Sequence, residues 1–135
     1  MKWFLVLAVA APLCAQTCTY SFSPDPAQVI NVTAAGTTLA PIGVTAPDGC
    51  QWHYYSDSSS WISFTPAAFT TFSGNGTFSF SASANVQLSQ RQAKIFVVTN
   101  NGSVTFNINQ AAPVCDLTLA PVSYTHLTLP TNREV

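Results

Sequence analysis

Residues 93–110 read AKIFVVTNNGSVTFNINQ, and this stretch decides the fold class. Ala93–Thr99 and Ser103–Gln110 are two runs rich in β-branched and aromatic residues, and Asn100-Asn101-Gly102 separates them. Because Asn and Gly tolerate the positive φ that tight hairpin turns require, the pattern predicts two antiparallel strands joined at Gly102. The stretch therefore favours a β-structure whose consecutive strands are linked by short turns.

The sequence on the N-terminal side of this hairpin has the same character. Thr77–Ala82 alternates apolar and polar side chains, and Asn75-Gly76 marks a turn before it. Leu39–Val44 lies in an extended stretch that is rich in Thr and Pro. No helical periodicity of useful length is present. We expect an all-β domain, an immunoglobulin-like β-sandwich of about seven strands.

A repeat sets the limits of the domain. Cys18–Pro24 (CTYSFSP) recurs as Cys115–Pro121 (CDLTLAP), with the Cys and Pro matched outright. Self-similarity at a fixed spacing is typical of tandem arrays. We expect one β-sandwich domain over residues 16–112 and the start of a truncated second repeat over residues 113–121.

The N-terminus has the features of an export signal. Lys2 gives a short positive region, Trp3–Leu13 is apolar, and small residues follow before Gln16. This anatomy predicts a secretory signal peptide over residues 1–15, and no other stretch is long and apolar enough to insert in a membrane. The mature protein is then secreted, in a compartment where disulfides persist.

The C-terminal segment has a different origin. Val122–Thr131 (VSYTHLTLPT) resembles a translated sequencing-adapter sequence, and Asn132–Val135 runs into the adjoining tag. We expect residues 122–135 to be an artefact and give no functional weight to His126. Further repeats or a C-terminal domain are then missing from this fragment.

Composition excludes some partners. The formal net charge is -1 and only 7% of residues are charged, with the four basic residues scattered along the chain. Nucleic-acid binding through a basic face is therefore disfavoured. A hydrophobic fraction of 47% is ample for a packed core.

The cysteines of the unit predict a disulfide rather than a metal site. Cys18 and Cys50 are a natural pair in an exported domain, whereas Cys115 belongs to the second repeat and stays unpaired. A metal site needs more ligands at close spacing, and only His53 lies nearby. We expect no metal and no cofactor.

Catalysis by this domain is not expected. The G-x-S-x-G motif of a nucleophile elbow is missing from the sequence. Paired-carboxylate hydrolysis needs two acids that flank the substrate, and the unit contains only Asp25, Asp48 and Asp57, with no Glu. The Ser residues are so numerous that a Ser-His-Asp set with His53 is expected by chance.

Strand alternation selects candidate binding residues. If Cys50 points inward to meet Cys18, Trp52 and Tyr54 point inward too, and the residues between them face out. Exposed aromatic and polar side chains there would suit weak glycan contact. Large aromatic residues are usually buried, so Trp61 is equally interpreted as a core residue, and for Tyr55 the two interpretations are balanced. The candidate glycan-binding residues are Tyr55, His53, Asp57, Trp61, Phe69 and Phe72, the last two as an exposed apolar patch.

Several short motifs follow one another along the unit. They are Cys18–Pro24, Gly49–Trp52, Ser60–Ile62, Gly74–Thr77, Ala84-Asn85, Arg91 and Ile108–Gln110. In this order and spacing they resemble the BACON domain, a bacterial extracellular module that is often found in tandem beside carbohydrate-active or protease domains. The chain departs from that pattern at His53–Tyr55 and at Ala67–Phe72.

The resemblance implies a role in binding carbohydrate or mucin glycans. We therefore expect a secreted, non-catalytic module of a longer bacterial protein that binds glycans weakly or targets a substrate surface. The alternative is a passive spacer repeat that positions another domain.

Overall fold

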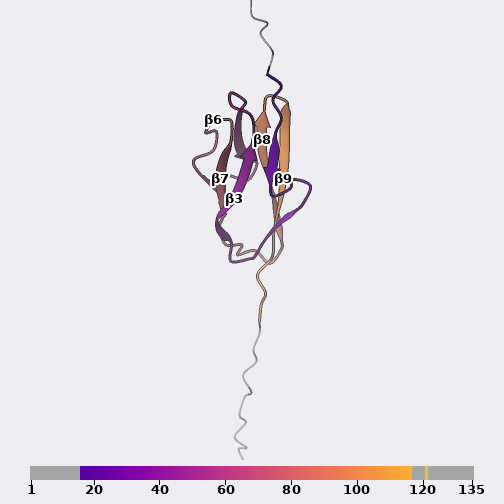
Figure 1. Cartoon of the computed structure of the whole chain (residues 1–135). Helices are drawn as coiled ribbons and strands as arrows, with labels where there is room; N and C mark the ends of the chain where they lie inside the picture. Colours follow the sequence, from indigo (N-terminus) through magenta and orange to yellow (C-terminus); the bar gives the residue numbers. More distant parts are fainter. Residues whose placement is uncertain (1–15, 117–120, 122–135) are drawn as a thin grey trace, which may run out of the picture.

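The structure of the protein is a computed structural model that describes residues 16–116 and residue 121. The predicted signal peptide (1–15), residues 117–120 of the second repeat and the adapter-like segment (122–135) lie outside the described residues. Within the described part the chain forms two packed sheets (Figure 1). The strands are β1 (Ser21–Ser23), β2 (Ile30–Val32), β3 (Thr37–Thr45), β4 (Gln51–Ser56), β5 (Ile62–Thr65), β6 (Phe72–Ser73), β7 (Gly76–Ala82), β8 (Arg91–Thr99) and β9 (Gly102–Gln110).

The strand order is that of a β-sandwich. One sheet has four strands in the order β1-β3-β7-β5, and the other has five in the order β2-β9-β8-β4-β6. Neighbouring strands are antiparallel except β2 and β9, which pair in parallel. The all-β sandwich is confirmed. The structure describes nine strands, where the sequence predicted about seven, because β1, β2 and β6 have only two or three residues, too few for a periodic pattern.

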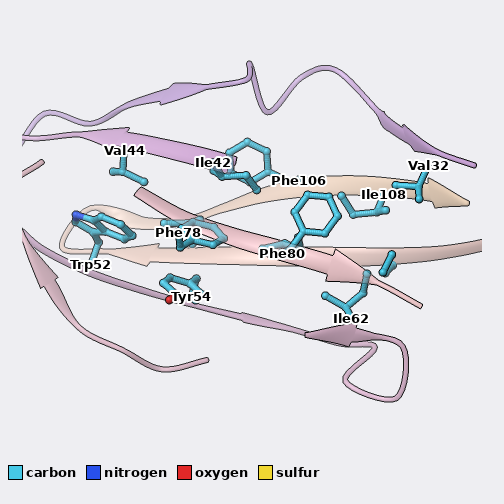
Figure 2. Close-up of a cluster of buried hydrophobic side chains, with 14 residues drawn as sticks. Val32, Ile42, Val44, Trp52, Tyr54, Ile62, Phe78, Phe80, Phe106 and Ile108 are labelled. Carbon is cyan, nitrogen blue, oxygen red and sulfur yellow. The ribbon is translucent and has the colours of Figure 1, made fainter. Parts of the chain in front are cut away.

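The core lies between the two sheets and is built by alternation along the longer strands. In β7 the side chains of Phe78 and Phe80 are buried, and in β8 those of Ile95 and Val97 are buried. Figure 2 shows Phe78 between the sheets together with aromatic residues from facing strands. Burying aromatic and branched side chains of this size stabilises each by about 1.5–3 kcal/mol, so the sandwich is held mainly by this layer.

The predicted hairpin is confirmed. β8 pairs with β9 in register from Arg91↔Gln110 to Thr99↔Gly102. Gly102 has a φ of 121°, a value that glycine adopts without the steric cost of a Cβ. The hairpin brings the outward-facing side chains of both strands onto one surface.

The predicted disulfide is also confirmed. Cys18 and Cys50 are bonded, with their Cα atoms 5.5 Å apart, and Cys115 is exposed and free among the described cysteines. The bond ties the segment before β1 to the residue before β4.

The chain enters and leaves the domain at opposite ends (Figure 1). At the entry end, the Asn101 side chain contacts the Cys18 carbonyl beside the β8–β9 turn. At the exit end, the Ala111 backbone amide donates to the Val32 carbonyl at 3.0 Å, and the Asn85 side-chain Nδ2 donates to the Ala111 carbonyl at 3.0 Å. Residues 16–116 and 121 include no helix that is long and apolar enough to cross a membrane.

Candidate functional site

The outer face of β4 carries two of the predicted site residues. Trp52 and Tyr54 are buried, whereas His53 and Tyr55, which alternate with them along the strand, are partly exposed. The inward direction predicted for Trp52 and Tyr54 is therefore confirmed. Tyr54 stacks on Phe78 of the opposite sheet with ring centroids 3.9 Å apart, which fixes the direction of the whole strand.

Four aromatic side chains gather on this face, and we call His53, Tyr55, Phe69 and Phe96 the aromatic platform. The Tyr55 ring is stacked on Phe69 at 5.4 Å and on Phe96 at 5.0 Å between centroids. His53 lies 6.3 Å from Phe69. Tyr55 was expected to be exposed, but its ring is half-buried because Phe69 and Phe96 cover its two sides.

Phe69 reaches the platform from the loop between β5 and β6. It is 66% exposed and has a positive φ of 64°. Its amide donates to the Tyr54 carbonyl at 2.8 Å, and the next residue, Thr70, bonds back to the Ala67 carbonyl. The loop thus docks on β4 and holds an apolar ring at the surface, and binding residues are often found on loops held by a rigid scaffold.

Asp57 follows β4 and is anchored to the neighbouring strand. Its Oδ1 accepts the Lys94 amide at 2.9 Å and the Ser58 hydroxyl at 2.9 Å. The Asp57 amide donates in turn to the Lys94 carbonyl at 3.2 Å. The carboxylate is therefore held two residues beyond Tyr55, next to β8.

A groove of about 390 Å³ continues the same face beyond Asp57. We call this the polar groove. Its lining comes from β8, β9, the residue after β4 and the residue before β2. Its polar members are Asp57, Gln92, Lys94, Asn107 and Asn109.

Two predicted residues lie elsewhere. Phe72 is half-buried and stacks on Trp52 at 4.5 Å, so it packs against the core and is not part of an exposed patch. The reason is that β6 pairs with β4 and turns Phe72 inward. Trp61 precedes β5 in the other sheet, and the Arg91 guanidinium lies 4.3 Å from its ring centroid. The platform therefore forms without either residue.

Among the described residues no three His, Cys, Asp or Glu side chains gather as a metal site. The side-chain hydrogen bonds within residues 16–116 include none to His53, so no carboxylate orients the imidazole and no serine hydroxyl faces it there. Flat aromatic surface next to amide and charged groups is what remains on this face.

Comparison with protein families matches residues 52–111 to the BACON family model, described as "Putative binding domain, N-terminal". Residues 52–111 are therefore similar to the BACON domain. None of the curated proteins compared with the chain matches it.

Two solved structures were found to be similar to this chain. One is a Bacteroides ovatus GH5 xyloglucanase in complex with a XXXG heptasaccharide, with a TM-score of 0.57 and 19% identity over 76% of this chain and 21% of that chain. The chain thus spans about a fifth of that enzyme, and the likeness shows the fold alone. The other is the Vibrio cholerae VesB protease, with a TM-score of 0.37 and 16% identity over 70% of this chain and 32% of that chain.

Several of the motif residues hold the scaffold at its exit end. Gln110 is fully buried, and its Oε1 accepts the Arg91 Nε at 2.7 Å. Its Nε2 donates to the carbonyls of Thr33 and Ser83. The Arg91 guanidinium also packs on the Trp61 ring. Through these hydrogen bonds the motif residues satisfy one another's polar groups and those of the loop carbonyls.

A second set of motif residues fixes the crossing between the sheets. The Trp52 indole donates to the Gly74 carbonyl at 2.8 Å, and the Asn75 side chain accepts the Ala46 amide at 3.0 Å. A Cβ on Gly76 would lie 2.7 Å from the Trp52 ring, so only glycine fits there. These motif residues therefore hold the fold together and do not form the aromatic platform.

Sequence reasoning missed the part of this face that β8 and β9 contribute. Phe96, Lys94 and Gln92 point outward, and Asn107 faces them from β9. The signal was present, since Ile95 and Val97 alternate with these residues in the hairpin. The alternation predicts the two strands of the hairpin, but it does not indicate that the outward side chains form a binding surface.

Proposed function

We propose that this domain is a secreted, non-catalytic module that binds carbohydrate weakly through the aromatic platform, as part of a longer protein. The observation that carries the proposal is the Tyr55 ring, stacked between Phe69 and Phe96 on the outer face. Aromatic faces stack on the C–H surfaces of sugar rings, and rigid rings lose little conformational entropy when they do so. The family's description as a binding domain supports this choice.

The affinity should be low. The platform is an open surface, with Phe69 66% exposed, so it contacts a bound sugar on one side only. The sugar therefore buries little surface and keeps much of its water. We expect dissociation constants on the order of 0.1–1 mM.

Isothermal titration of the protein with a broad set of polysaccharide fragments tests this function. Phe69→Ala removes an exposed stacking surface, and Tyr55→Ala removes the ring that supports Phe69 and Phe96. Each variant should weaken binding by about five- to tenfold, since such contacts contribute about 1–1.5 kcal/mol. Leu88→Ala is the matched control, because Leu88 is 80% exposed in the loop before β8, away from the platform. Its affinity should equal that of the wild type.

The outcomes separate the candidate functions. Binding that survives Tyr55→Ala and Phe69→Ala would discard the platform and direct attention to Trp61. A lack of binding to every fragment would favour the alternative function, a passive spacer. The spacer is supported by one observation, the entry and exit of the chain at opposite ends of the domain, which suits modules joined in a line.

A further inference from the structure

The polar groove holds side chains whose hydrogen-bonding capacity is unused. Within residues 16–116, no hydrogen bond is recorded for the side chains of Gln92, Asn107 or Lys94, although all three line the groove. Asn109 Oδ1 is buried and also has no partner. The exposed amides of Gln92 and Asn107 and the Lys94 ammonium are therefore free to form hydrogen bonds with a ligand in the groove.

The groove is continuous with the aromatic platform. Along β8 the outward side chains are Phe96, Lys94 and Gln92, and alternate residues of a strand lie roughly 6.6 Å apart. In the sheet Lys94 pairs with Asn107 and Gln92 pairs with Asn109. A ligand that stacks on the platform and extends along β8 therefore passes directly over the groove.

We propose that the polar groove is a second subsite of this face, and that the ligand is a neutral, linear glycan lying along β8 from Phe96 towards Gln92. This inference rests on the proposed function. The aromatic platform takes one sugar unit by stacking, and the groove takes the hydroxyl groups of the units that follow. The binding unit is then an oligosaccharide rather than a single sugar.

The charges of the groove favour a neutral glycan over an acidic one. Lys94 supplies one positive charge and Asp57 one negative charge, so the lining has no net charge. The amides of Gln92, Asn107 and Asn109 provide both donors and acceptors, which matches a hydroxyl group because it is both. A uronic acid carboxylate placed here would gain no net attraction, because repulsion by the Asp57 carboxylate offsets attraction by the Lys94 ammonium.

Backbone amide NMR spectra of the labelled protein, titrated with neutral β-linked oligosaccharides of increasing length, test the two subsites. A disaccharide should shift the amides of Tyr55 and Phe69 and leave those of Lys94 and Asn107 in place. A hexasaccharide should shift both groups and bind about tenfold more tightly. An oligogalacturonate of the same length should bind more weakly than the neutral hexasaccharide.

Variants of the groove complete the test. Gln92→Ala and Asn107→Ala should each lower the hexasaccharide affinity by about fivefold, the weight of a lost hydrogen bond, and leave the disaccharide affinity unchanged. Gln87→Ala is the matched control, because Gln87 is exposed in the loop before β8 and does not line the groove.

Each contrary result has its own meaning. If the hexasaccharide shifts only the platform amides, the second subsite is wrong and the proposed function stands. If it shifts only the groove amides, the platform is wrong and so is the joint site. Tighter binding of oligogalacturonate would overturn the neutral class of ligand, and no shift with any oligosaccharide would overturn both the inference and the proposed function.

Discussion

Tyr54 carries a hydroxyl group into the core, and its proton couples stability to pH. The side chain is fully buried, and its hydroxyl donates to the Pro66 carbonyl at 2.8 Å. Burial raises the pKa of Tyr54 above its ordinary value of 10.0, because the phenolate would be poorly solvated there. The folded protein thus holds this proton more tightly than the unfolded chain does.

The stability of the protein should fall as the pH rises above 10. Below pH 10 the phenol is neutral in both states, so its stabilising contribution is fully present, and it is lost as pH rises above 10. Urea unfolding should show Tyr54→Phe to be less stable than wild type by about 1 kcal/mol at pH 7, the weight of the lost hydrogen bond. This gap should shrink as the pH approaches 11, and a gap that stays constant would contradict the interpretation.

At the scale of single residues, the sequence predicted which side chains of the site point inward and which point outward. The inward direction of Trp52 followed from its spacing to Cys50, and the outward direction of His53 followed from the same rule. Phe72 escaped this rule because β6 has only two residues, too few for a periodic pattern. Its stacking on Trp52 depends on a pairing between distant segments, which one sequence does not reveal.

The disulfide links two elements that lack a strand ladder between them. Cys18 precedes β1 in the four-stranded sheet, and Cys50 precedes β4 in the five-stranded sheet, with a separation of 32 residues. Closing a loop of that length restricts the unfolded chain and stabilises the fold by about 3–4 kcal/mol in the chain-entropy model. Cys18→Ser combined with Cys50→Ser should lower the free energy of unfolding by that amount in urea.

A matched substitution separates this effect from the loss of a thiol. Cys115→Ser should leave the unfolding curve unchanged, because Cys115 is exposed and free among the described cysteines. Wild type unfolded in the presence of a reductant should behave like the double variant. A double variant as stable as the wild type would show that strand pairing alone holds the entry end of the domain.

Between elements, local pairing was predictable and distant pairing was not. The β8–β9 hairpin followed from its turn residues, which lie next to both strands in sequence. The parallel pairing of Ile30 with Ile108 joins segments at opposite ends of the domain, and no turn signal marks it. The platform is formed in the same non-local way, since β4, β8 and the Phe69 loop must meet before its aromatic rings can stack.

At the scale of the whole molecule, the exit end defines where the domain stops. Gln110 is fully buried, the Ala111 amide bonds to the Val32 carbonyl, and Val114 is 91% exposed. The last strong contacts are therefore made by Gln110 and Ala111. The domain boundary at residue 112 and the artefact over residues 122–135 remain predictions, and truncation can test both.

Two truncated chains make that test with a matched comparison. A chain that ends at Pro113 should have the thermal midpoint of the full chain, because the removed part begins at an exposed residue and contributes no core contact that the structure describes. A chain that ends at Asn109 loses Gln110, so the Arg91 Nε loses its acceptor and the carbonyls of Thr33 and Ser83 each lose one of their donors. Leaving such groups unpaired costs about 2 kcal/mol or more. Since 1 kcal/mol corresponds to about 4–8 °C for a domain of this size, the midpoint should fall by about 10 °C or more. A similar fall for the chain ending at Pro113 would mean that part of residues 114–135 packs on the domain, and the predicted boundary would be wrong. A chain ending at Pro121 would then show whether residues 122–135 cause the fall, in which case the predicted artefact would be wrong too.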